Sequence, residues 1–384
     1  MYEVLTLNKI AKCGLDNLDD GIFTITDEVK DPDAIILRSF KMHDMELGDN
    51  LKCVARAGAG TNNIPIDKCS EKGIVVFNTP GANANGVKEL AICALLLAAR
   101  DVVGGIAWAN TLTEDVAKQV EKGKSKFGGT ELMGKTLGVI GLGAIGGKIA
   151  NTAIHLGMNV IGCDPFLSIE GAWNLNHRVS RAATYDEVFE KADYITLHVP
   201  ATKETKNMIC TESIAKMKNG VKIINLSRAD LVNAEELKAA LAEGKVSAYV
   251  TDFPTEEVIN TPGVVAIPHL GASTEESEDN CAVMAARQLD DYLKNGNIKN
   301  SVNYPNVEMP RSGVARICVL HQNIPSILTK ITAAVADEGL NIENLTNKSK
   351  GENAYTLLDV SSTPSEDAIA RIASVEGINR VRVI

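Results

Sequence analysis

Residues 136–147 read T-L-G-V-I-G-L-G-A-I-G-G, an apolar run that breaks into glycines at Gly141, Gly143 and Gly146. The run predicts a buried parallel strand, because strands covered on both faces are almost continuously hydrophobic. Glycines directly after such a strand let backbone N–H groups approach a pyrophosphate at the N-terminus of the next helix. The spacing therefore predicts a dinucleotide-binding site.

The residues that follow the glycines favour the same interpretation. Apolar side chains recur on one face of residues 147–156, which predicts a helix that ends at Gly157. Residues 159–163 predict a second strand, which Asp164 follows. A carboxylate there accepts hydrogen bonds from the adenosine ribose and repels a 2′-phosphate, so NAD is favoured over NADP. A lone glycine motif is a weak signal, but strand, loop, helix, strand and acid in this order favour a cofactor site over a structural turn.

Composition limits the class of protein. The 384 residues suffice for two or three domains, and a net charge of −10 argues against a nucleic-acid partner. No uncharged apolar stretch is long enough to cross a bilayer, and no signal peptide is recognisable, so we expect a cytoplasmic protein without a membrane partner. The eight cysteines include no C-x-x-C pair and the six histidines no H-E-x-x-H. We therefore expect neither a disulfide framework nor a metal site.

The first hundred residues alternate short apolar strands with helical stretches, which predicts a small parallel α/β domain. Ligands of such sheets bind beyond the carboxyl ends of the strands, and arginines follow two of the predicted strands. One group is Arg38, Ser39 and Lys41, and the other is Arg56, Ala57 and Gly58. The arginines and the glycine turn are suited to bind a small anionic substrate, but solvated strand ends explain them equally well.

Residues 87–100 are apolar on nearly every side, which predicts a helix buried between two domains or two subunits. We therefore expect a homo-oligomer, at least a dimer. Residues 101–132 predict a second, amphipathic helix and a glycine-containing loop. The first domain boundary is expected near Arg100.

Further strands are predicted at residues 193–198, 221–226, 247–250 and 264–267, enough for a doubly wound sheet of about six strands. Arg228, Glu256 and His269 follow three of these strands. Hydride transfer between NAD and a hydroxy acid needs a base of near-neutral pKa, a carboxylate that supports it and a guanidinium for the substrate. Taken singly, Arg228 is more often an ion-pair partner, Glu256 a solvated acid and His269 a histidine of the core. Their joint placement favours catalysis.

The last third predicts a separate module. A helix is expected over residues 273–294 and a linker, containing Pro305 and Pro310, over residues 301–312. Residues 315–384 then predict the order β-α-β-β-α-β of a ferredoxin-like module. Its small size suits a regulatory domain better than a catalytic one.

At this level the chain resembles the D-isomer-specific 2-hydroxyacid dehydrogenase family. The resemblance rests on G-L-G-A-I-G with Asp164, L-H-V-P-A-T-K-E-T, N-L-S-R, D-F-P-T-E and P-H-L-G-A-S-T. It implies Arg228, Glu256 and His269 as the catalytic set and Asp252 near the nicotinamide amide. The implied cofactor contacts are Gly141, Gly143, Ala144, Ile145, Gly146, Asp164, His198, Pro200, Thr205, Leu226, Ser227, Asp252 and Gly271.

The resemblance also implies three domains. These are a Rossmann-type NAD-binding domain of residues 100–279, a discontinuous, flavodoxin-like substrate-binding domain of residues 1–99 and 280–312, and a regulatory domain of residues 313–384. R-S-F-K and A-R-A-G-A-G-T-N look like the substrate loops of family members that act on a phosphorylated acid. Arg38, Lys41 and Arg56 are then candidates for the phosphate and the carboxylate.

The C-terminal module resembles an ACT domain, with H-Q-N-I-P and G-L-N-I at the matching places. In ACT domains that bind serine, residues matching His321, Asn323 and Asn341 line the effector site at a dimer interface, so L-serine is a candidate effector. Two other functions stay open. One is a sibling dehydrogenase whose substrate carries no phosphate, and the other is a non-enzymatic NAD(H)-sensing protein that shares the fold.

Overall fold

The computed structural model describes residues 1–384, which form two compact units. One unit is Met1–Asn83 with Glu278–Ile384, and the other is Ala84–Ser277. The strands are β1 (Tyr2–Leu7), β2 (Phe23–Thr26), β3 (Ala34–Leu37), β4 (Cys53–Arg56), β5 (Val75–Phe77), β6 (Thr136–Ile140), β7 (Asn159–Cys163), β8 (Val179–Arg181), β9 (Tyr194–Leu197), β10 (Val221–Asn225), β11 (Val246–Thr251), β12 (Val264–Ala266), β13 (Ala315–Gln322), β14 (Ile342–Lys350), β15 (Asn353–Val360) and β16 (Ile378–Val383). The helices are α1 (Lys12–Leu15), α2 (Ile66–Glu71), α3 (Ala84–Ala99), α4 (Val102–Ala109), α5 (Val116–Gly123), η1 (Lys124–Phe127), α6 (Gly146–His155), α7 (Ile169–Trp173), α8 (Tyr185–Lys191), α9 (Thr211–Lys216), η2 (Ala229–Leu231), α10 (Ala234–Ala242), α11 (Glu275–Asn295), α12 (Ile327–Asp337) and α13 (Glu366–Ala373).

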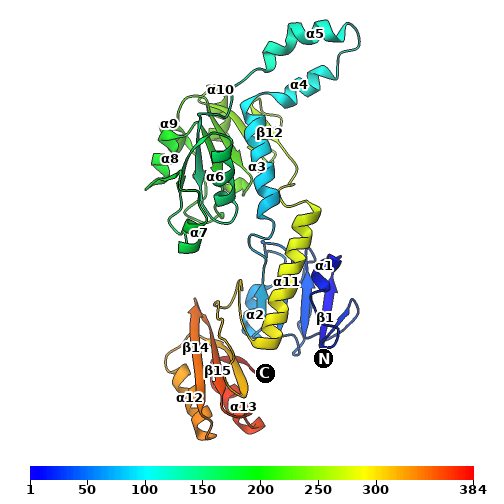
Figure 1. The fold of residues 1–384 in the computed structure, drawn as a ribbon, viewed down its shortest axis with the longest axis vertical. Helices are drawn as coiled ribbons and strands as arrows, with labels where there is room; N and C mark the ends of the chain where they lie inside the picture. Colours follow the sequence, from blue (N-terminus) through cyan, green and yellow to red (C-terminus); the bar gives the residue numbers. More distant parts are fainter. The chain divides into compact units, whose positions relative to one another are not determined.

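The unit Ala84–Ser277 is built on a seven-stranded parallel sheet in the order β12-β11-β10-β9-β6-β7-β8. Apolar residues of α3 and α6 pack on one face, and those of α8, α9 and α10 on the other (Figure 1). The prediction of a doubly wound sheet is confirmed. The expected six strands were one too few, because β8 has only three residues, none of them buried. Since β6 pairs with both β7 and β9, the chain reverses its direction of winding beside the glycine loop, where such folds bind ligands.

The apolar segment after Asn83 forms α3, of which one face packs on α6, β10 and β11. Its other face stays exposed within the chain, with Leu96 45% accessible. Residues 101–132 contain the two α-helices α4 and α5 and the short 3₁₀ helix η1, rather than the one helix expected. α4 is apolar without a buried residue, and only α5 is amphipathic. Figure 1 shows α4 and α5 as a hairpin that projects from the rest of this unit.

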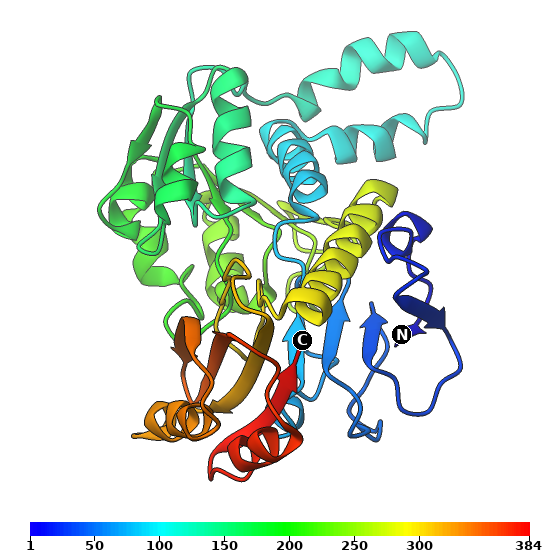
Figure 2. The ribbon, with the colours of Figure 1, turned by 60° about the horizontal axis from the view of Figure 1, so that its bottom comes forward.

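The other unit contains a five-stranded parallel sheet in the order β2-β1-β3-β4-β5. This is the flavodoxin-like order, and the predicted parallel α/β domain is confirmed. Figure 2 shows α11 lying beside this sheet, and the two share one apolar core that includes Ala285, Leu289 and Tyr292. The domain boundaries assigned from the sequence remain predictions.

Residues 315–384 form the expected β-α-β-β-α-β module, with an antiparallel sheet in the order β14-β15-β13-β16. One face of this sheet packs on α12 and α13. Residues of the opposite face, among them Cys318, Leu320 and Tyr355, join the core formed by α11 and the five-stranded sheet. The module is therefore packed on the rest of its unit through a face that a free ferredoxin-like domain exposes.

The proline-containing segment expected as a linker is itself packed into this core. Tyr304 is fully buried, and its hydroxyl donates a hydrogen bond to the carbonyl of Ser70 (2.9 Å). The amide of Asn303 bonds to the backbone of β5 and its preceding residue, accepting from Val76 N (2.9 Å) and donating to Ile74 O (2.9 Å). None of the helices combines the length and the apolar composition that a membrane span requires.

Candidate active site

The glycine loop after β6 is shaped by two close approaches of the backbone. Gly141 has φ 87°, and a Cβ at this residue would lie 2.4 Å from the carbonyl oxygen of His198. A Cβ at Gly146 would lie 1.9 Å from the carbonyl oxygen of Gly141. Neither position accepts a side chain, because both clashes are with backbone.

Gly143, at the top of the loop, faces open space, and a Cβ there would meet no protein atom within 4 Å. α6 begins three residues later, at Gly146, and no side chain caps its N-terminus at Ile145. Its first N–H groups therefore lack intrahelical acceptors, and together with the helix dipole they favour an anion. The loop fits the pyrophosphate of NAD, with Ala144 exposed beside Gly143.

Asp164 is held in place at the end of β7. Its Oδ2 accepts a hydrogen bond from Leu142 N (2.9 Å) and its Oδ1 one from Phe166 N (2.8 Å). Because a carboxylate has about four acceptor positions, each oxygen retains capacity for a ribose hydroxyl. The structure thus orients the acid that the sequence predicted for the adenosine ribose.

Asp252, at the end of β11, carries an unsatisfied oxygen. The residue is 1% exposed, its Oδ2 accepts from Gly271 N (3.3 Å), and its Oδ1 has no partner. Burial raises the pKa of this carboxyl, while the charges of His269 and Arg228 act to lower it. A buried acceptor without a donor is costly, and an amide N–H₂ of the nicotinamide would satisfy it.

His198 follows β9 on the other side of the glycine loop. Its Nε2 shares a hydrogen bond with Thr196 Oγ1 (2.8 Å), whereas its buried Nδ1 has no partner. Burial lowers the pKa of His198 to about 3, so the imidazole is neutral at physiological pH. A neutral ring at this position would add no charge to the predicted cofactor site.

The remaining predicted cofactor residues shape the neighbouring loops. Thr205 Oγ1 donates to the carbonyl of Pro200 (2.6 Å), and Ser227 Oγ donates to the carbonyl of Leu197 (2.6 Å). Leu226, the residue before Ser227, is buried, with 6% of its surface exposed. These bonds fix loop backbones at the carboxyl ends of β9 and β10, and the contacts with NAD stay predictions.

Arg228 and His269 both lie against an aromatic ring, Phe253, that the sequence analysis did not single out. The guanidinium carbon of Arg228 is 5.4 Å from the centroid of Phe253, and the rings of Phe253 and His269 have centroids 4.4 Å apart. Arg228 Nη1 also donates to the carbonyl of Ser227 (2.6 Å). Phe253 therefore positions both predicted catalytic groups. Its place in D-F-P-T-E, directly after Asp252, was the available signal.

The structure does not bring Glu256 to His269. Glu256 is exposed, and no hydrogen bond or ion pair joins the two side chains. The carboxyl group whose pKa responds to the charge of His269 is that of Asp252. The role of Glu256 as the acid that supports the histidine stays a prediction.

The two arginine loops of the other unit are joined through Asn63, which the sequence analysis missed. Its Oδ1 accepts from Arg56 Nε (3.2 Å), and its Nδ2 donates to the carbonyls of Phe40 (2.7 Å) and Arg38 (3.3 Å). Partial burial lowers the pKa of Arg56, and the positive charge of Arg38 adds to this effect. Two positive charges near each other would suit an anion, and the substrate contacts of these loops stay predictions.

Contacts around these loops differ from one residue to the next. Arg38 pairs with Glu278 at 2.6 Å, and both side chains are more than 40% exposed. The backbone N–H groups of Ser39 and Phe40 both donate to Asn8 Oδ1 (3.0 and 2.6 Å), while Lys41 is exposed and has no ion-pair partner. In the second loop, Ala57 is buried, and a Cβ at Gly58 would lie 2.4 Å from Arg56 Nη1. Gly58 thus makes room for the guanidinium.

The three predicted effector residues do not meet within one chain. His321 is 1% exposed, and both ring nitrogens have partners at 2.8 Å, the carbonyl of Gln322 and Thr356 Oγ1. His321 pairs with Ala354 at one end of β15, whereas β14 begins beside Val360 at the other end, directly after Asn341. Six residues of strand separate the two ends by roughly 20 Å. Asn323 and Asn341 are both exposed. No group of three or more His, Cys, Asp or Glu side chains suited to a metal lies together.

Comparisons with known proteins agree with this geometry. Residues 96–271 match the family model described as "D-isomer specific 2-hydroxyacid dehydrogenase, NAD binding domain". D-3-phosphoglycerate dehydrogenase of Methanocaldococcus jannaschii is 35% identical, with 83% of this chain and 60% of the relative covered. The enzyme of the same name from Haemophilus influenzae is 30% identical, with 98% of this chain and 94% of the relative covered. The chain thus spans about three fifths of the length of the first relative and nearly all of the second.

Solved structures share the fold. The NAD⁺-bound 3-phosphoglycerate dehydrogenase of Entamoeba histolytica superposes with a TM-score of 0.61 at 31% identity, covering 79% of this chain and 98% of that one. A glyoxylate reductase from Paecilomyes thermophila gives a TM-score of 0.64 at 24% identity, covering 78% and 98%, and this likeness concerns the fold alone. The resemblance read from the motifs and the prediction of NAD as cofactor are confirmed. The chain belongs to the D-isomer-specific 2-hydroxyacid dehydrogenase family, and residues 96–271 match its NAD-binding domain.

Proposed function

We propose that the protein oxidises 3-phospho-D-glycerate to 3-phosphohydroxypyruvate with NAD, the first step of the phosphorylated route to L-serine. The observation that carries this substrate is the pair of arginine loops joined by Asn63, which provides positive charge for a substrate with two anionic groups. The names of the relatives, D-3-phosphoglycerate dehydrogenase at 30–36% identity, support the same choice.

Each predicted catalytic residue has a role in the oxidation. NAD, when bound, accepts the hydride from the carbon that carries the hydroxyl. The imidazole of His269 takes the hydroxyl proton, and Phe253 holds its ring in place through the contact described above. Arg228 binds the substrate carboxylate and stabilises the developing carbonyl. Glu256 supports the imidazolium once its loop approaches His269.

The substrate groups divide between the two arginine loops. Arg38 and Lys41 bind the phosphate, since both are accessible and Lys41 has no ion-pair partner. Arg56 and the backbone of Ala57 and Gly58 bind a carboxylate oxygen. Glu278 orients Arg38 in the absence of substrate and must release or share it when the phosphate arrives.

The test follows NADH absorbance with 3-phosphohydroxypyruvate against hydroxypyruvate. We expect the phosphorylated substrate to be preferred by kcat/KM. Arg38→Gln should lower kcat/KM for it by about 10- to 100-fold, the value of one charged hydrogen-bonded contact, and leave hydroxypyruvate almost unaffected. Lys30→Gln removes an exposed charge of the same unit and serves as the control. Equal or reversed preference would assign a sibling reductase activity, and tight NADH binding without turnover would assign a sensor.

The active form is a homo-oligomer that associates through α3, α4 and α5. Val103 and Ile106 on α4 are 46% and 58% exposed, and Leu96 on α3 is 45% exposed. Large apolar side chains gathered on projecting helices are typical of a protein interface.

If subunits associate through α4, charged residues placed on this helix should weaken the association. The double variant Val103→Glu/Ile106→Glu should reduce the mass measured by light scattering, toward the 41.0 kDa of one chain if this is the only contact. The matched variant Lys206→Glu changes an exposed residue of the same unit and should keep the wild-type mass. An unchanged mass in the double variant would place the subunit contact elsewhere.

L-serine is the proposed effector of the C-terminal module, with His321, Asn323 and Asn341 as its contacts. Because these residues lie at opposite ends of the module, the site requires a second copy of the chain to complete it. Inhibition by L-serine in the assay above, and its loss in Asn341→Ala, test this assignment.

A further inference from the structure

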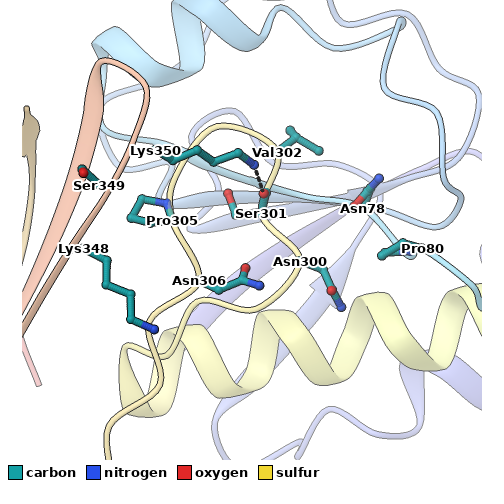
Figure 3. Close-up of a pocket in the computed structure, with 10 residues that line it drawn as sticks. All are labelled: Asn78, Pro80, Asn300, Ser301, Val302, Pro305, Asn306, Lys348, Ser349 and Lys350. Carbon is teal, nitrogen blue, oxygen red and sulfur yellow. Dashed lines mark hydrogen bonds between the residues drawn. The ribbon is translucent and has the colours of Figure 1, made fainter. Parts of the chain in front are cut away.

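A pocket of about 650 Å³ lies where the C-terminal module meets the five-stranded domain of the same unit (Figure 3). Asn78 and Pro80, which follow β5, form one wall. The loop of residues 300–306 forms the floor, and residues 348–350 of β14 close the other side. None of these residues belongs to the candidate active site.

The pocket has a positive charge without a counterion. Lys348 and Lys350 are the charged side chains that line it, and no carboxylate does. Neither lysine is in an ion pair. Lys350 Nζ donates to the carbonyl of Ser301 (2.8 Å), which holds the ammonium against the floor and leaves its other two N–H groups free (Figure 3). Partial burial lowers the pKa of Lys350, and an anion bound beside the ammonium would oppose this effect.

Neutral hydrogen-bonding groups complete the lining. Asn78, Asn300 and Asn306 also line the pocket, although Asn78 Nδ2 is bonded to the carbonyl of Ala59 and Asn300 Nδ2 to Gln288 Oε1 (2.7 Å). Two ammonium groups and no carboxylate around a small, open volume match an anion with several oxygens better than an apolar ligand.

The wall of the pocket is bonded directly to the second arginine loop. Asn78 Nδ2 donates to the carbonyl of Ala59 (2.6 Å), and the adjacent Thr79 N donates to the carbonyl of Gly58 (3.1 Å). On the floor side, Asn78 N donates to the carbonyl of Asn300 (3.3 Å). A ligand that moved Asn78 or Asn300 would therefore move the backbone of Gly58 and Ala59.

We propose that this pocket is a second anion site, which Lys348 and Lys350 provide for a small dianion carrying a phosphate or two carboxylates. Its occupancy changes the affinity of the loop at residues 56–60 for substrate. The binding claim stands on the pocket alone, whereas the effect on substrate affinity rests on the proposed function.

Calorimetry on the full chain tests the binding. Inorganic phosphate and malonate are titrated separately into Arg38→Gln/Lys41→Gln, in which phosphate binding at the substrate loops is weakened. We expect one binding event per chain for at least one anion, and at least tenfold weaker binding when Lys348→Gln/Lys350→Gln is added. The matched control Lys12→Gln/Lys330→Gln removes equal charge from exposed positions outside the pocket and should keep the affinity.

The two probes separate the ligand classes. Binding of phosphate alone assigns the pocket to phosphate esters, and binding of malonate alone assigns it to dicarboxylates. No binding of either anion, or equal affinity with and without the two lysines, overturns the proposal.

Kinetics test the coupling. With both substrate-loop residues intact, the anion that binds should change the KM for 3-phosphohydroxypyruvate at least twofold. Lys348→Gln/Lys350→Gln should show the wild-type KM without the anion and no response to it. If the anion binds but leaves KM unchanged, the anion site is retained and its coupling to the substrate loop is disproved. Failure of the proposed function would appear separately, as absent turnover with calorimetric binding retained.

Discussion

Replacing His269 with glutamine is expected to lower kcat by about 10²- to 10⁴-fold while the dissociation constant of NADH stays within twofold. General acid–base catalysis contributes an effect of this size, and glutamine retains hydrogen-bonding groups but takes up no proton at neutral pH. The imidazole packs on Phe253 and not on the glycine loop, so cofactor binding should be spared. Stopped-flow or steady-state NADH absorbance measures the first quantity, and NADH fluorescence the second.

His177→Gln is the matched control, since His177 is an exposed histidine of the same unit outside the site. It should retain wild-type turnover. Near-normal turnover in His269→Gln with NADH binding undisturbed would remove His269 from the catalytic set. A loss of NADH binding in parallel with turnover would indicate that His269 acts on the cofactor site and not on the substrate proton.

The fold was predictable where one local pattern decides it. The apolar run before Gly141 and the acid after Cys163 specify a strand, a turn, a helix and a second strand within about thirty residues. The structure places these elements as expected. β8 was not predicted, because three residues are too few to show a hydrophobic periodicity. This strand forms through its pairing with β7.

For the candidate active site, the sequence predicted which residues follow the ends of strands but not their contacts with one another. Parallel strands bring their carboxyl ends to one edge, which is why Arg228 and His269 were expected near each other. The groups between and behind them were not predictable, since Phe253 and Asn63 act through tertiary contacts that have no sequence spacing. The distance from Glu256 to His269 depends on a loop conformation that a strand pattern leaves open.

The packing of the C-terminal module left a signal that the sequence analysis did not use. Residues 315–321 are all buried, on both faces of β13, which requires a cover on each side of the sheet. The sequence A-R-I-C-V-L-H has apolar residues on both faces, a pattern typical of a doubly covered strand. What it does not reveal is the partner surface, here α11 and the five-stranded sheet.

Arg316 shows how polar chemistry is accommodated in that interface. It is fully buried and makes a two-pronged ion pair with Asp359, at 2.6 Å from Nε to Oδ1 and 2.8 Å from Nη2 to Oδ2. Arg316 Nη1 also donates to the carbonyl of Asn295 at the end of α11 (2.8 Å). Asp359 Oδ2 accepts from the backbone of Ser312 (2.8 Å). The pair thus ties β13 and β15 to α11 and to the segment that precedes the module.

Removing one partner of the Arg316–Asp359 ion pair should therefore destabilise this unit strongly. We expect Asp359→Ala to lower the free energy of unfolding by about 3–5 kcal/mol, because it leaves a buried guanidinium without its counterion. The urea midpoint of the full chain, followed by fluorescence, measures the change. Glu121→Ala breaks an exposed pair with Lys124 and should cost less than about 1 kcal/mol. If Asp359→Ala does not accumulate as folded protein, Asp359→Asn, which keeps the shape, replaces it.

The pH dependence of the difference between wild type and Asp359→Asn separates the ion pair from a packing effect. Burial acts to raise the pKa of Asp359, but the hydrogen bonds from Arg316 and Ser312 outweigh it and hold the pKa below its ordinary value of 3.8. A carboxyl whose pKa is depressed on folding stabilises the folded state fully above its unfolded pKa. This contribution is lost as the pH falls from there through the folded value. The stability difference should thus be constant from pH 7 to about pH 5 and shrink toward pH 3. A difference that stays constant down to pH 3 would mean that asparagine destabilises the interface through its shape and not through the missing charge.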